Sequence, residues 1–256
     1  MKLIPIYLIL VIISACSPLA IETPAPTESP VPGTATPEPT HTATVVWFPP
    51  TATFTPFPTP VITPTANFLT DIGQVILTDD FSTAENWTLQ ANSEAGVALS
   101  KGELTAAIKG SKAYVYSIRE EPLLDDFYIE ITANPNLCKG ADEYGLLLRV
   151  SDSDDYYRYS LSCDSQVRLD RVIGYTASSP QPWMLSGDVP PGAPSISRLG
   201  AWLSGDEMRF FVNGQHQFTV KDPMLSRGRI GIFARSTGAN AVTVNFSNLV
   251  IRAIQE

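Results

Sequence analysis

From about residue 74 onward, the chain consists of short apolar, β-branched and aromatic runs separated by clusters of Gly, Asn, Asp and Pro. No long segment keeps apolar residues at the 3.6-residue spacing of an amphipathic helix. Many short strands at regular spacing are typical of an all-β sandwich or barrel. We therefore expect strands over 74–81, 86–91, 96–100, 103–109, 113–118, 127–133, 144–151, 156–163, 166–173, 197–204, 207–214, 216–220, 229–235 and 241–254.

Two of the turns between these runs have specific sequences. Asn213-Gly214 lies between two apolar runs, and this dipeptide accepts positive φ at both central positions of a type I′ hairpin turn. The acidic stretch from Ser151 to Asp155 predicts a second turn, between the runs at 144–151 and 156–163. One sandwich domain over residues 71–256 accounts for all of these runs.

Residues 16–70 have a different composition, rich in Pro and Thr, and contain 13 of the 22 prolines. Proline removes backbone donors and fixes φ, so this segment is expected to form neither a helix nor a central strand. We expect a disordered linker of extended, polyproline-II-like chain. The density of Thr-Pro would suit O-glycosylation, which the sequence does not demonstrate.

The N-terminus has the features of an export signal. Lys2 is followed by a hydrophobic stretch over residues 3–13, which is too short for a stable transmembrane helix. The tetrapeptide from Ile13 to Cys16 resembles the lipobox of bacterial lipoproteins, in which cleavage before the cysteine leaves a lipid-modified N-terminus. This resemblance implies that residues 1–15 are a signal peptide, that Cys16 carries the lipid, and that the protein is anchored at the outer face of a bacterial cell membrane. The alternative is an ordinary secretory signal with an incidental Cys16.

The net charge of −9 argues against nucleic acid as a partner, because phosphate binding requires clustered Lys and Arg. The two other cysteines can be explained by the expected strands. Cys138 precedes the run at 144–151 and Cys163 ends the run at 156–163, so a hairpin between these runs brings the two together. We predict a disulfide between Cys138 and Cys163, with two buried thiols as the alternative. Nothing in the sequence indicates the oligomeric state.

A series of short motifs occurs in the order found in a known group of proteins. Its members are Asp79-Asp80-Phe81 with Asn86-Trp87, Phe127–Glu130, Gly145–Arg149, Tyr156–Tyr159, Val167–Arg171, Phe211–Gly214, Gly228–Phe233 and Val244–Leu249. This order resembles exported bacterial proteins with a concanavalin A-like (laminin G-like) jelly roll, closest to the 3-keto-disaccharide hydrolase type. The resemblance implies a two-sheet antiparallel jelly-roll sandwich and a link to glycans. It does not carry activity, because one fold hosts many functions.

We expect no catalytic residues. Glycoside hydrolysis normally needs two carboxylates, and glucanases of this fold often carry Glu-x-Asp-x-Glu along one strand, which is absent here. Asp142 and Glu143 are adjacent at a strand start, so we expect them on opposite faces as solvated edge residues. No cofactor is indicated. A structural Ca²⁺ ion stays open, with Asp79 and Asp80 as its weak candidate ligands.

Aromatic and Arg side chains along the middle strands are the candidate ligand-binding residues. Aromatic faces stack on the apolar faces of sugar rings, and Arg donates forked hydrogen bonds to hydroxyls or carboxylates. The set comprises Arg149, Tyr157, Tyr159, Arg168, Arg171 and Trp183. Tyr157 and Tyr159 have core positions as their alternative. The leading hypothesis is a lipid-anchored module that binds carbohydrate without catalysis. The alternatives are a glycoside-acting enzyme of the 3-keto-disaccharide hydrolase type and a structural or adhesion protein that binds another protein.

Overall fold

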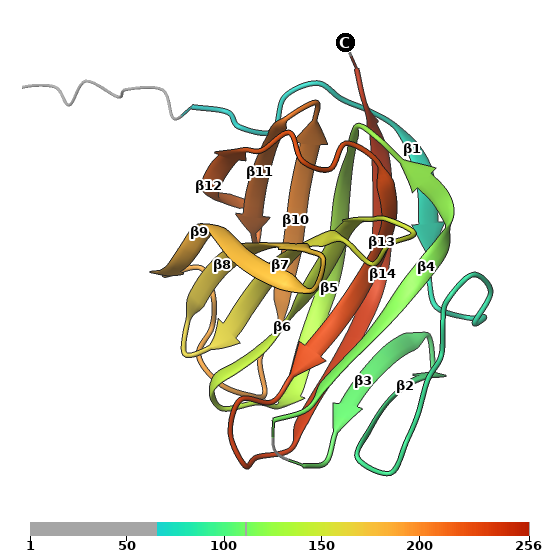
Figure 1. Cartoon of the computed structure of the whole chain (residues 1–256), viewed down its shortest axis with the longest axis vertical. Coiled ribbons are helices and arrows are strands. Elements are labelled where there is room, and N and C mark those ends of the chain that lie inside the picture. Colours follow the sequence, from blue (N-terminus) through green and yellow to red (C-terminus); the bar gives the residue numbers. More distant parts are fainter. Residues whose placement is uncertain (1–65, 111, 256) are drawn as a thin grey trace, which may run out of the picture. The chain divides into compact units, whose positions relative to one another are not determined.

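The computed structural model describes residues 66–110 and 112–255, in which fourteen β-strands form two antiparallel sheets (Figure 1). The strands are β1 (Ile72–Asp79), β2 (Ala95–Ser100), β3 (Glu103–Ile108), β4 (Tyr114–Leu124), β5 (Phe127–Leu137), β6 (Gly140–Val150), β7 (Tyr156–Cys163), β8 (Gln166–Ile173), β9 (Thr176–Leu185), β10 (Ser197–Ser204), β11 (Glu207–Val212), β12 (Gln215–Lys221), β13 (Gly228–Arg235) and β14 (Val242–Ile254).

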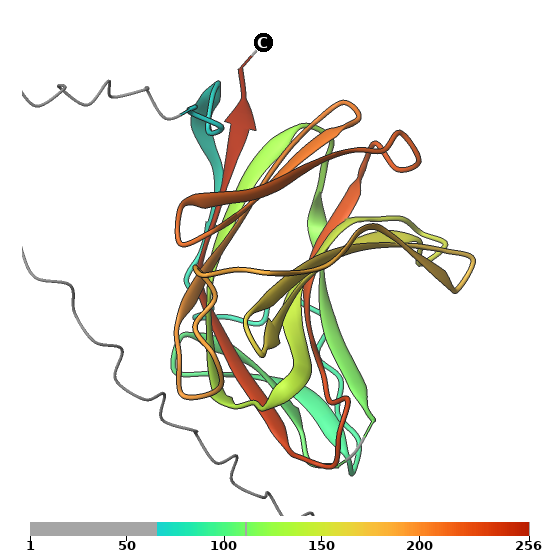
Figure 2. The same ribbon diagram turned by 90° about the vertical axis from the view of Figure 1, so that its left-hand side faces the viewer.

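The two sheets differ in size and connection. The eight-stranded sheet has the order β12-β11-β10-β5-β14-β3-β2, with β1 also paired to β14. The six-stranded sheet has the order β4-β13-β6-β7-β8-β9. The sheets stack as two layers, and the hairpin of β8 and β9 projects beyond the other strands of its sheet (Figure 2). The expected two-sheet antiparallel sandwich is therefore confirmed.

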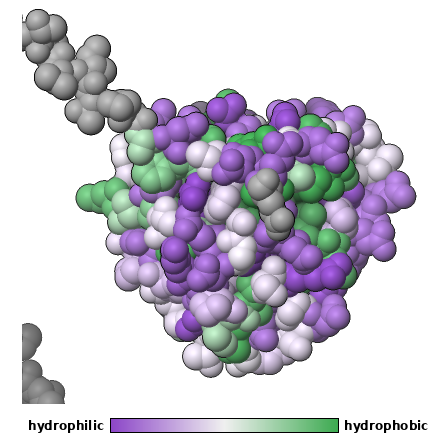
Figure 3. All heavy atoms as spheres, turned by 90° about the horizontal axis from the view of Figure 1, so that it is seen from above, coloured by the Kyte–Doolittle hydropathy of each residue, from purple (hydrophilic) through white to green (hydrophobic). Residues whose placement is uncertain are grey.

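The space between the sheets is filled by one large apolar cluster. Side chains from both sheets contribute to it, including Phe127 of β5, Tyr159 of β7, Phe210 of β11 and Phe246 of β14, all 0% exposed. Alternate residues of each strand point into this cluster, as the two-residue period of a strand requires. The opposite face of each sheet is the outer face. Seen from above the view of Figure 1, hydrophilic residues cover much of the surface, with apolar residues in separate groups (Figure 3).

Both expected turns are confirmed. Asn213 and Gly214 join β11 to β12 with φ angles of 52° and 80°, as a type I′ turn requires. The acidic turn between β6 and β7 is closed by Ser151, whose backbone N–H donates to the Asp155 carbonyl at 2.9 Å. The Ser151 hydroxyl also accepts the backbone N–H groups of Ser153 and Asp155.

The predicted disulfide between Cys138 and Cys163 is present. Their Cα atoms lie 5.9 Å apart, at the end of the β6–β7 pair opposite the acidic turn. Gly140 pairs with Cys163 across these strands, which brings the preceding Cys138 within reach. The hairpin derived from the sequence is thus the correct reason for the bridge.

Two strand predictions are wrong. Residues 86–91 form only isolated bridges at Trp87 and Ala91, not a strand. Strand β9 was missed because Pro180 and Pro182 lie within it, and proline donates no hydrogen bond to a ladder. β9 tolerates both prolines because it is the edge of its sheet and, among the strands described, pairs only with β8.

The segment before β1 packs on the outer face of the eight-stranded sheet. Leu69 lies against the cluster of Tyr128, Trp202 and Phe211, and the Trp202 indole donates to the Thr70 carbonyl at 3.2 Å. The Phe68 ring stacks on His216 at 3.8 Å between centroids. The last residues of the expected linker over 16–70 therefore contact the sandwich.

The other N-terminal predictions lie outside the described residues. These are the signal peptide over 1–15, the lipid attachment at Cys16 and the linker as far as residue 65. Within residues 66–110 and 112–255, no helix is long and apolar enough to span a membrane.

Candidate functional site

The side chains of β7 show how the six-stranded sheet divides its residues between core and outer face. Tyr157, Tyr159 and Leu161 belong to the core cluster. Tyr156 and Arg158 alternate with them and therefore lie on the outer face of the six-stranded sheet. Residues at these positions are therefore the ones that β7 offers to a ligand on this outer face.

The expectation that Tyr157 and Tyr159 bind a ligand needs correction, because both are 0% exposed between the sheets. The Tyr157 hydroxyl donates to the Asp222 carboxylate at 2.9 Å, and the Tyr159 hydroxyl donates to the Phe211 carbonyl at 3.2 Å. Burial raises the pKa of Tyr159 well above its ordinary value and raises that of Tyr157 to about 12. Both residues fill the core and satisfy their hydroxyls there, which was the alternative.

Arg149 also needs correction, since its side chain is fully buried. A register shift in the pairing of β6 with β13 adds a residue to β6 near its end, and Arg149 has a φ of 51° there. Its guanidinium donates to the carbonyls of Gly205, Leu225 and Asp125 at 2.8–3.1 Å and lies 3.6 Å from the Asp126 carboxylate. Burial lowers the pKa of Arg149, while Asp126 opposes that shift. Arg149 therefore has a structural role inside the sandwich, where it holds the segments around Asp125, Gly205 and Leu225 close to one another.

Arg171 is held at the edge of the sandwich by a different partner. Its Nη1 lies 2.6 Å from the carboxylate of Asp222, which also accepts the Tyr157 hydroxyl. Arg171 is in phase with Leu169, a core residue, so it does not share the outer face with Arg168. The structure therefore separates Arg171 from the two remaining candidates.

Arg168 and Trp183 do come together on the outer face. The Arg168 guanidinium lies 4.3 Å from the centroid of the Trp183 ring, in cation–π contact. Arg168 Nη2 also lies 3.1 Å from Glu143 and 2.9 Å from Asp170. Two further arginines extend this set, as Arg158 pairs with Asp170 at 2.6 Å and Arg235 pairs with Glu143 at 3.2 Å. We call the resulting row Arg158, Asp170, Arg168, Glu143 and Arg235 the arginine–carboxylate chain.

The carboxylates of this chain are buried and fully engaged. Glu143 accepts from Arg235 on one oxygen and from Arg168 on the other. Asp170 accepts from the Ser179 hydroxyl on one oxygen and from Arg158 on the other, and the second oxygen also forms an ion pair with Arg168. The expectation that Glu143 and Asp142 are solvated edge residues is wrong, because both are at most 3% exposed. Asp142 is bound instead by the backbone N–H groups of Lys139 and Thr237.

A hollow of about 200 Å³, which we call the aromatic hollow, lies beside the arginine–carboxylate chain. It is lined by Tyr114, Tyr116, Ile118, Leu147, Val150, Asp154, Tyr156, Val172 and Tyr175. Arg158 connects the two features, because its guanidinium lies 5.9 Å from the Tyr114 ring centroid and 5.8 Å from that of Phe233. Burial raises the pKa of Tyr114, which is therefore a neutral hydroxyl at physiological pH. The outer face thus combines apolar ring surface with fixed guanidinium groups.

Most residues of this face were missed from the sequence. The signal that could have found them is the phase of β7, where core positions 157, 159 and 161 leave positions 156, 158, 160 and 162 on the other face. The register then aligns Ser160 with Gly145 on one side and Arg168 on the other. The partners of Arg158 and Arg235 lie on other strands and follow only from the sheet order.

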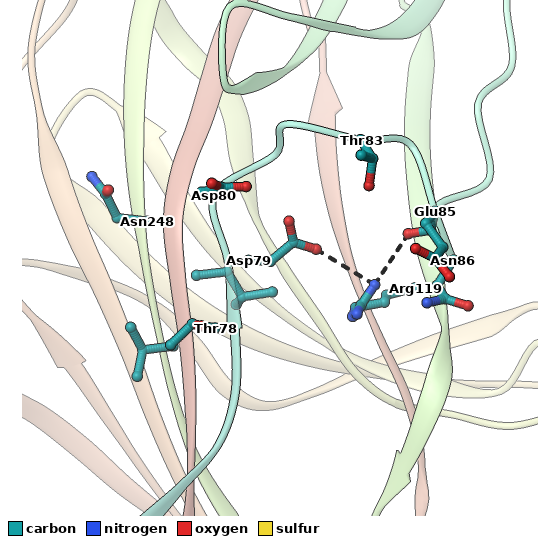
Figure 4. Close-up of a pocket in the computed structure, with 10 residues that line it drawn as sticks. Thr78, Asp79, Asp80, Thr83, Glu85, Asn86, Arg119 and Asn248 are labelled. Carbon is teal, nitrogen blue, oxygen red and sulfur yellow. Dashed lines mark hydrogen bonds and ion pairs between the residues drawn. The ribbon is translucent and has the colours of Figure 1, made fainter.

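A second, polar pocket of about 480 Å³ surrounds the weak Ca²⁺ candidates Asp79 and Asp80 (Figure 4). Asp79 accepts the Phe81 backbone N–H and the Trp87 indole N–H, both at 2.9 Å, and lies 3.4 Å from Arg119. Both carboxylate oxygens of Asp79 therefore already accept hydrogen bonds, and the positively charged Arg119 lies beside them. Within the described residues, no group of three His, Cys, Asp or Glu could hold a metal. The surroundings of Asp79 therefore do not fit a calcium site.

The fold is a two-sheet antiparallel jelly-roll sandwich, as in galectin-like and glucanase structures that the chain is similar to. Among solved structures, the chain is similar to carbohydrate-binding module CBM66 from Bacillus subtilis, with 16% identity over 66% of this chain and 96% of that one (TM-score 0.53). It is also similar to a galectin-like protein of unknown function from Bacillus subtilis, with 14% identity over 72% and 99% (TM-score 0.54). The catalytic domain of an endo-1,3-β-glucanase (laminarinase) from Thermotoga petrophila aligns at 11% identity over 73% and 99% (TM-score 0.52).

At these identities the similarity shows the fold alone. No protein-family model matches the chain, and no curated protein matches it. The resemblance to the 3-keto-disaccharide hydrolase type therefore stays a prediction.

Proposed function

We propose that the protein binds carbohydrate on the outer face of the six-stranded sheet, without catalysis. The observation that carries the proposal is the aromatic hollow lying directly against the arginine–carboxylate chain. Tyr116 and Tyr175 expose ring surface on which a sugar ring can stack, with Tyr175 being 90% exposed. The arginines beside the hollow are held in place by buried carboxylates, so little additional ordering of these side chains is needed when a sugar binds.

The solved structures of similar fold support a role with carbohydrate. One of them is named a carbohydrate-binding module and two others are β-glucanases. A module that binds sugars on the face of its sheet is consistent with these similar structures and with the residues that line the aromatic hollow.

A glycan array probed with the purified protein tests the proposal. We expect binding to at least one oligosaccharide, and we expect Tyr116→Ala to weaken it. Leu137→Ala is the matched control, because Leu137 is an exposed apolar residue outside the hollow. Failure to bind any neutral or acidic glycan would contradict the proposed function and would favour a protein partner.

Hydrolysis is the second candidate, because a carboxylate pair exists across strands. Glu143 Oε2 and Asp170 Oδ2 both contact Arg168 Nη2, at 3.1 and 2.9 Å, so they lie no more than about 6 Å apart, a bound that includes the ~5–5.5 Å of retaining glycosidases. However, each of their four oxygens already accepts a hydrogen bond from an Arg or Ser. No oxygen is left directed at a substrate, and this favours binding over catalysis. Turnover of a 3-keto-glycoside that is lost in Glu143→Gln would reverse this preference.

We further propose that the sandwich is displayed at the outer face of a bacterial cell membrane, anchored through lipid on Cys16. The support is the order of the hydrophobic stretch, the small residues and Cys16 in the sequence. Expression in a bacterial host should place the protein in the membrane fraction, and Cys16→Ala should release it to the soluble fraction. Mass spectrometry of the mature N-terminus checks the attachment. An unmodified Cys16 in the mature protein would exclude a lipid anchor.

A further inference from the structure

We propose that the ligand of this face is an acidic sugar, and that Arg235 binds its carboxylate. This inference rests on the proposed carbohydrate-binding function and deepens it. The first observation is the charge of the arginine–carboxylate chain. Its three guanidinium groups face only two carboxylates, which leaves one net positive charge within this chain of five residues, in a protein whose net charge is −9. A local surplus of positive charge on an acidic protein attracts anions to that place.

The surplus is located at Arg235. The side chains of Asp170, Glu143, Arg158 and Arg168 are 2–16% exposed, whereas that of Arg235 is 42% exposed. Within the described residues, Arg235 pairs only with Glu143, through a single contact from Nη1. Glu143 is also neutralised by Arg168, so it does not depend on Arg235. Arg235, the exposed end of the arginine–carboxylate chain, therefore has guanidinium N–H groups that can donate two parallel hydrogen bonds to a carboxylate.

Arg235 is also placed beside the aromatic hollow. It pairs in register with Tyr114 on β4, and Phe233, two residues earlier, pairs with Tyr116. Neighbouring strands lie about 4.8 Å apart, and Tyr116 is diagonally opposite Arg235, so a sugar ring stacked over Tyr116 has its substituents within reach of Arg235. A carboxylate on the ring then meets Arg235 while the ring keeps its contact with Tyr116.

The acidic groups around the hollow give the ligand a direction. Asp154 lines the hollow from the β6–β7 turn. That turn follows Val150, which pairs in register with Arg229 of β13. Arg229 and Arg235 are six residues apart, which is about 20 Å along the strand. The nearby Glu120 and Asp152 are both paired with Arg229. A ligand carboxylate is therefore repelled from the turn end of the face and attracted to the Arg235 end.

The probes are a uronic-acid oligosaccharide and the same oligosaccharide after reduction of its carboxyl groups to alcohols. Isothermal titration calorimetry measures both against the wild-type protein and against Arg235→Gln, Arg235→Lys and Arg227→Gln. Arg227 is the charge-matched control, because it is exposed and paired with Asp125 away from the hollow. We expect wild type to bind the acidic form roughly tenfold more tightly than the reduced form, with the preference shrinking as salt is raised.

Arg235→Gln should remove this preference, because binding of the acidic form falls to the level of the reduced form. Arg235→Lys should retain part of it, since Lys keeps the charge and loses the fork. Equal affinity of wild type for both probes would overturn the inference and leave the proposed function standing. An equal loss for both probes in Arg235→Gln would overturn it too, because it would show a structural role. Absence of binding to either probe and to the full array would overturn the proposed function as well.

Discussion

Arg168 lies 4.3 Å from the ring centroid of Trp183 and simultaneously contacts two buried carboxylates. Trp183 belongs to β9, the edge strand that carries two prolines, and Arg168 belongs to β8. The indole therefore packs against a guanidinium that Glu143 and Asp170 also hold in place. Through these contacts, edge strand β9 packs against the arginine–carboxylate chain in the middle of the outer face.

Trp183→Ala should weaken glycan binding by at least about tenfold, because it removes an aromatic surface and frees the Arg168 side chain to move. The unfolding free energy should fall by only about 1 kcal/mol, the size of a partly exposed cation–π contact. Calorimetric titration with the glycan found on the array and urea denaturation measure the two effects. Unchanged affinity would place the ligand away from Arg168 and Trp183.

Asp170→Asn should destabilise the fold by about 3 kcal/mol. Asp170 is 2% exposed and faces both Arg158 and Arg168, so its removal leaves buried positive charge without a partner. In the wild type, burial is the largest single influence and lowers the pKa of Arg158, but the hydrogen bond to Asp170 and the charges of Tyr114, Asp170 and Glu143 together outweigh burial and raise that pKa. Urea denaturation gives the change in unfolding free energy.

Asp125→Asn is the control for Asp170→Asn. Its ion pair with Arg227 has both side chains 61% exposed, and such pairs contribute little, so we expect a change within about 0.5 kcal/mol. Equal effects of the two substitutions would mean that the arginine–carboxylate chain contributes no more to stability than a surface ion pair.

The fold could be predicted because it follows from local patterns. Short alternating runs, the Asn213-Gly214 turn and the acidic turn fix the strands, and two of these strands bring Cys138 and Cys163 together. Such signals act between neighbours in sequence, so they survive without knowledge of the sheet order. β9 was missed for the same reason, since only its place at a sheet edge makes Pro180 and Pro182 acceptable.

The site could be predicted only in part. Arg168 and Trp183 were recognised by residue type, and the structure brings them together. Arg149 was misplaced because the register shift near the end of β6 turns a long polar side chain inward, which alternation cannot foresee. Glu143 and Asp170 were missed because they lie on β6 and β8, separated by β7, so no spacing within one strand reveals them.

Removing the disulfide should destabilise the fold by about 3–4 kcal/mol. Cys138 and Cys163 are separated by 25 residues, and closing a loop of this length restricts the unfolded chain by that amount. Cys138→Ser with Cys163→Ser, compared with wild type in urea denaturation, measures the loss. The β6–β7 pairing continues from Glu143 to Leu148 beyond the bridge, so the double variant should still bind glycan. Loss of binding in a folded double variant would show that the bridge shapes the outer face.

Alkaline pH should unfold the protein through its buried tyrosines. Burial, followed by the hydrogen bond to Asp222, raises the pKa of Tyr157 to about 12 from an ordinary value near 10. Between these two values the folded state binds more protons than the unfolded state, so the unfolding free energy is retained below about pH 10 and falls as pH rises toward 12. Burial also raises the pKa values of Tyr144 and Tyr159, which adds to the same slope.

Urea denaturation from pH 8 to pH 11.5 measures this decrease in the unfolding free energy. Tyr157→Phe should make the slope shallower while lowering stability at pH 8 by about 1 kcal/mol. Surface tyrosines such as Tyr175 provide the control, since Tyr175→Phe should leave both the slope and the stability unchanged. An alkaline slope that is the same in Tyr157→Phe as in wild type would show that Tyr157 does not keep its proton in the folded core.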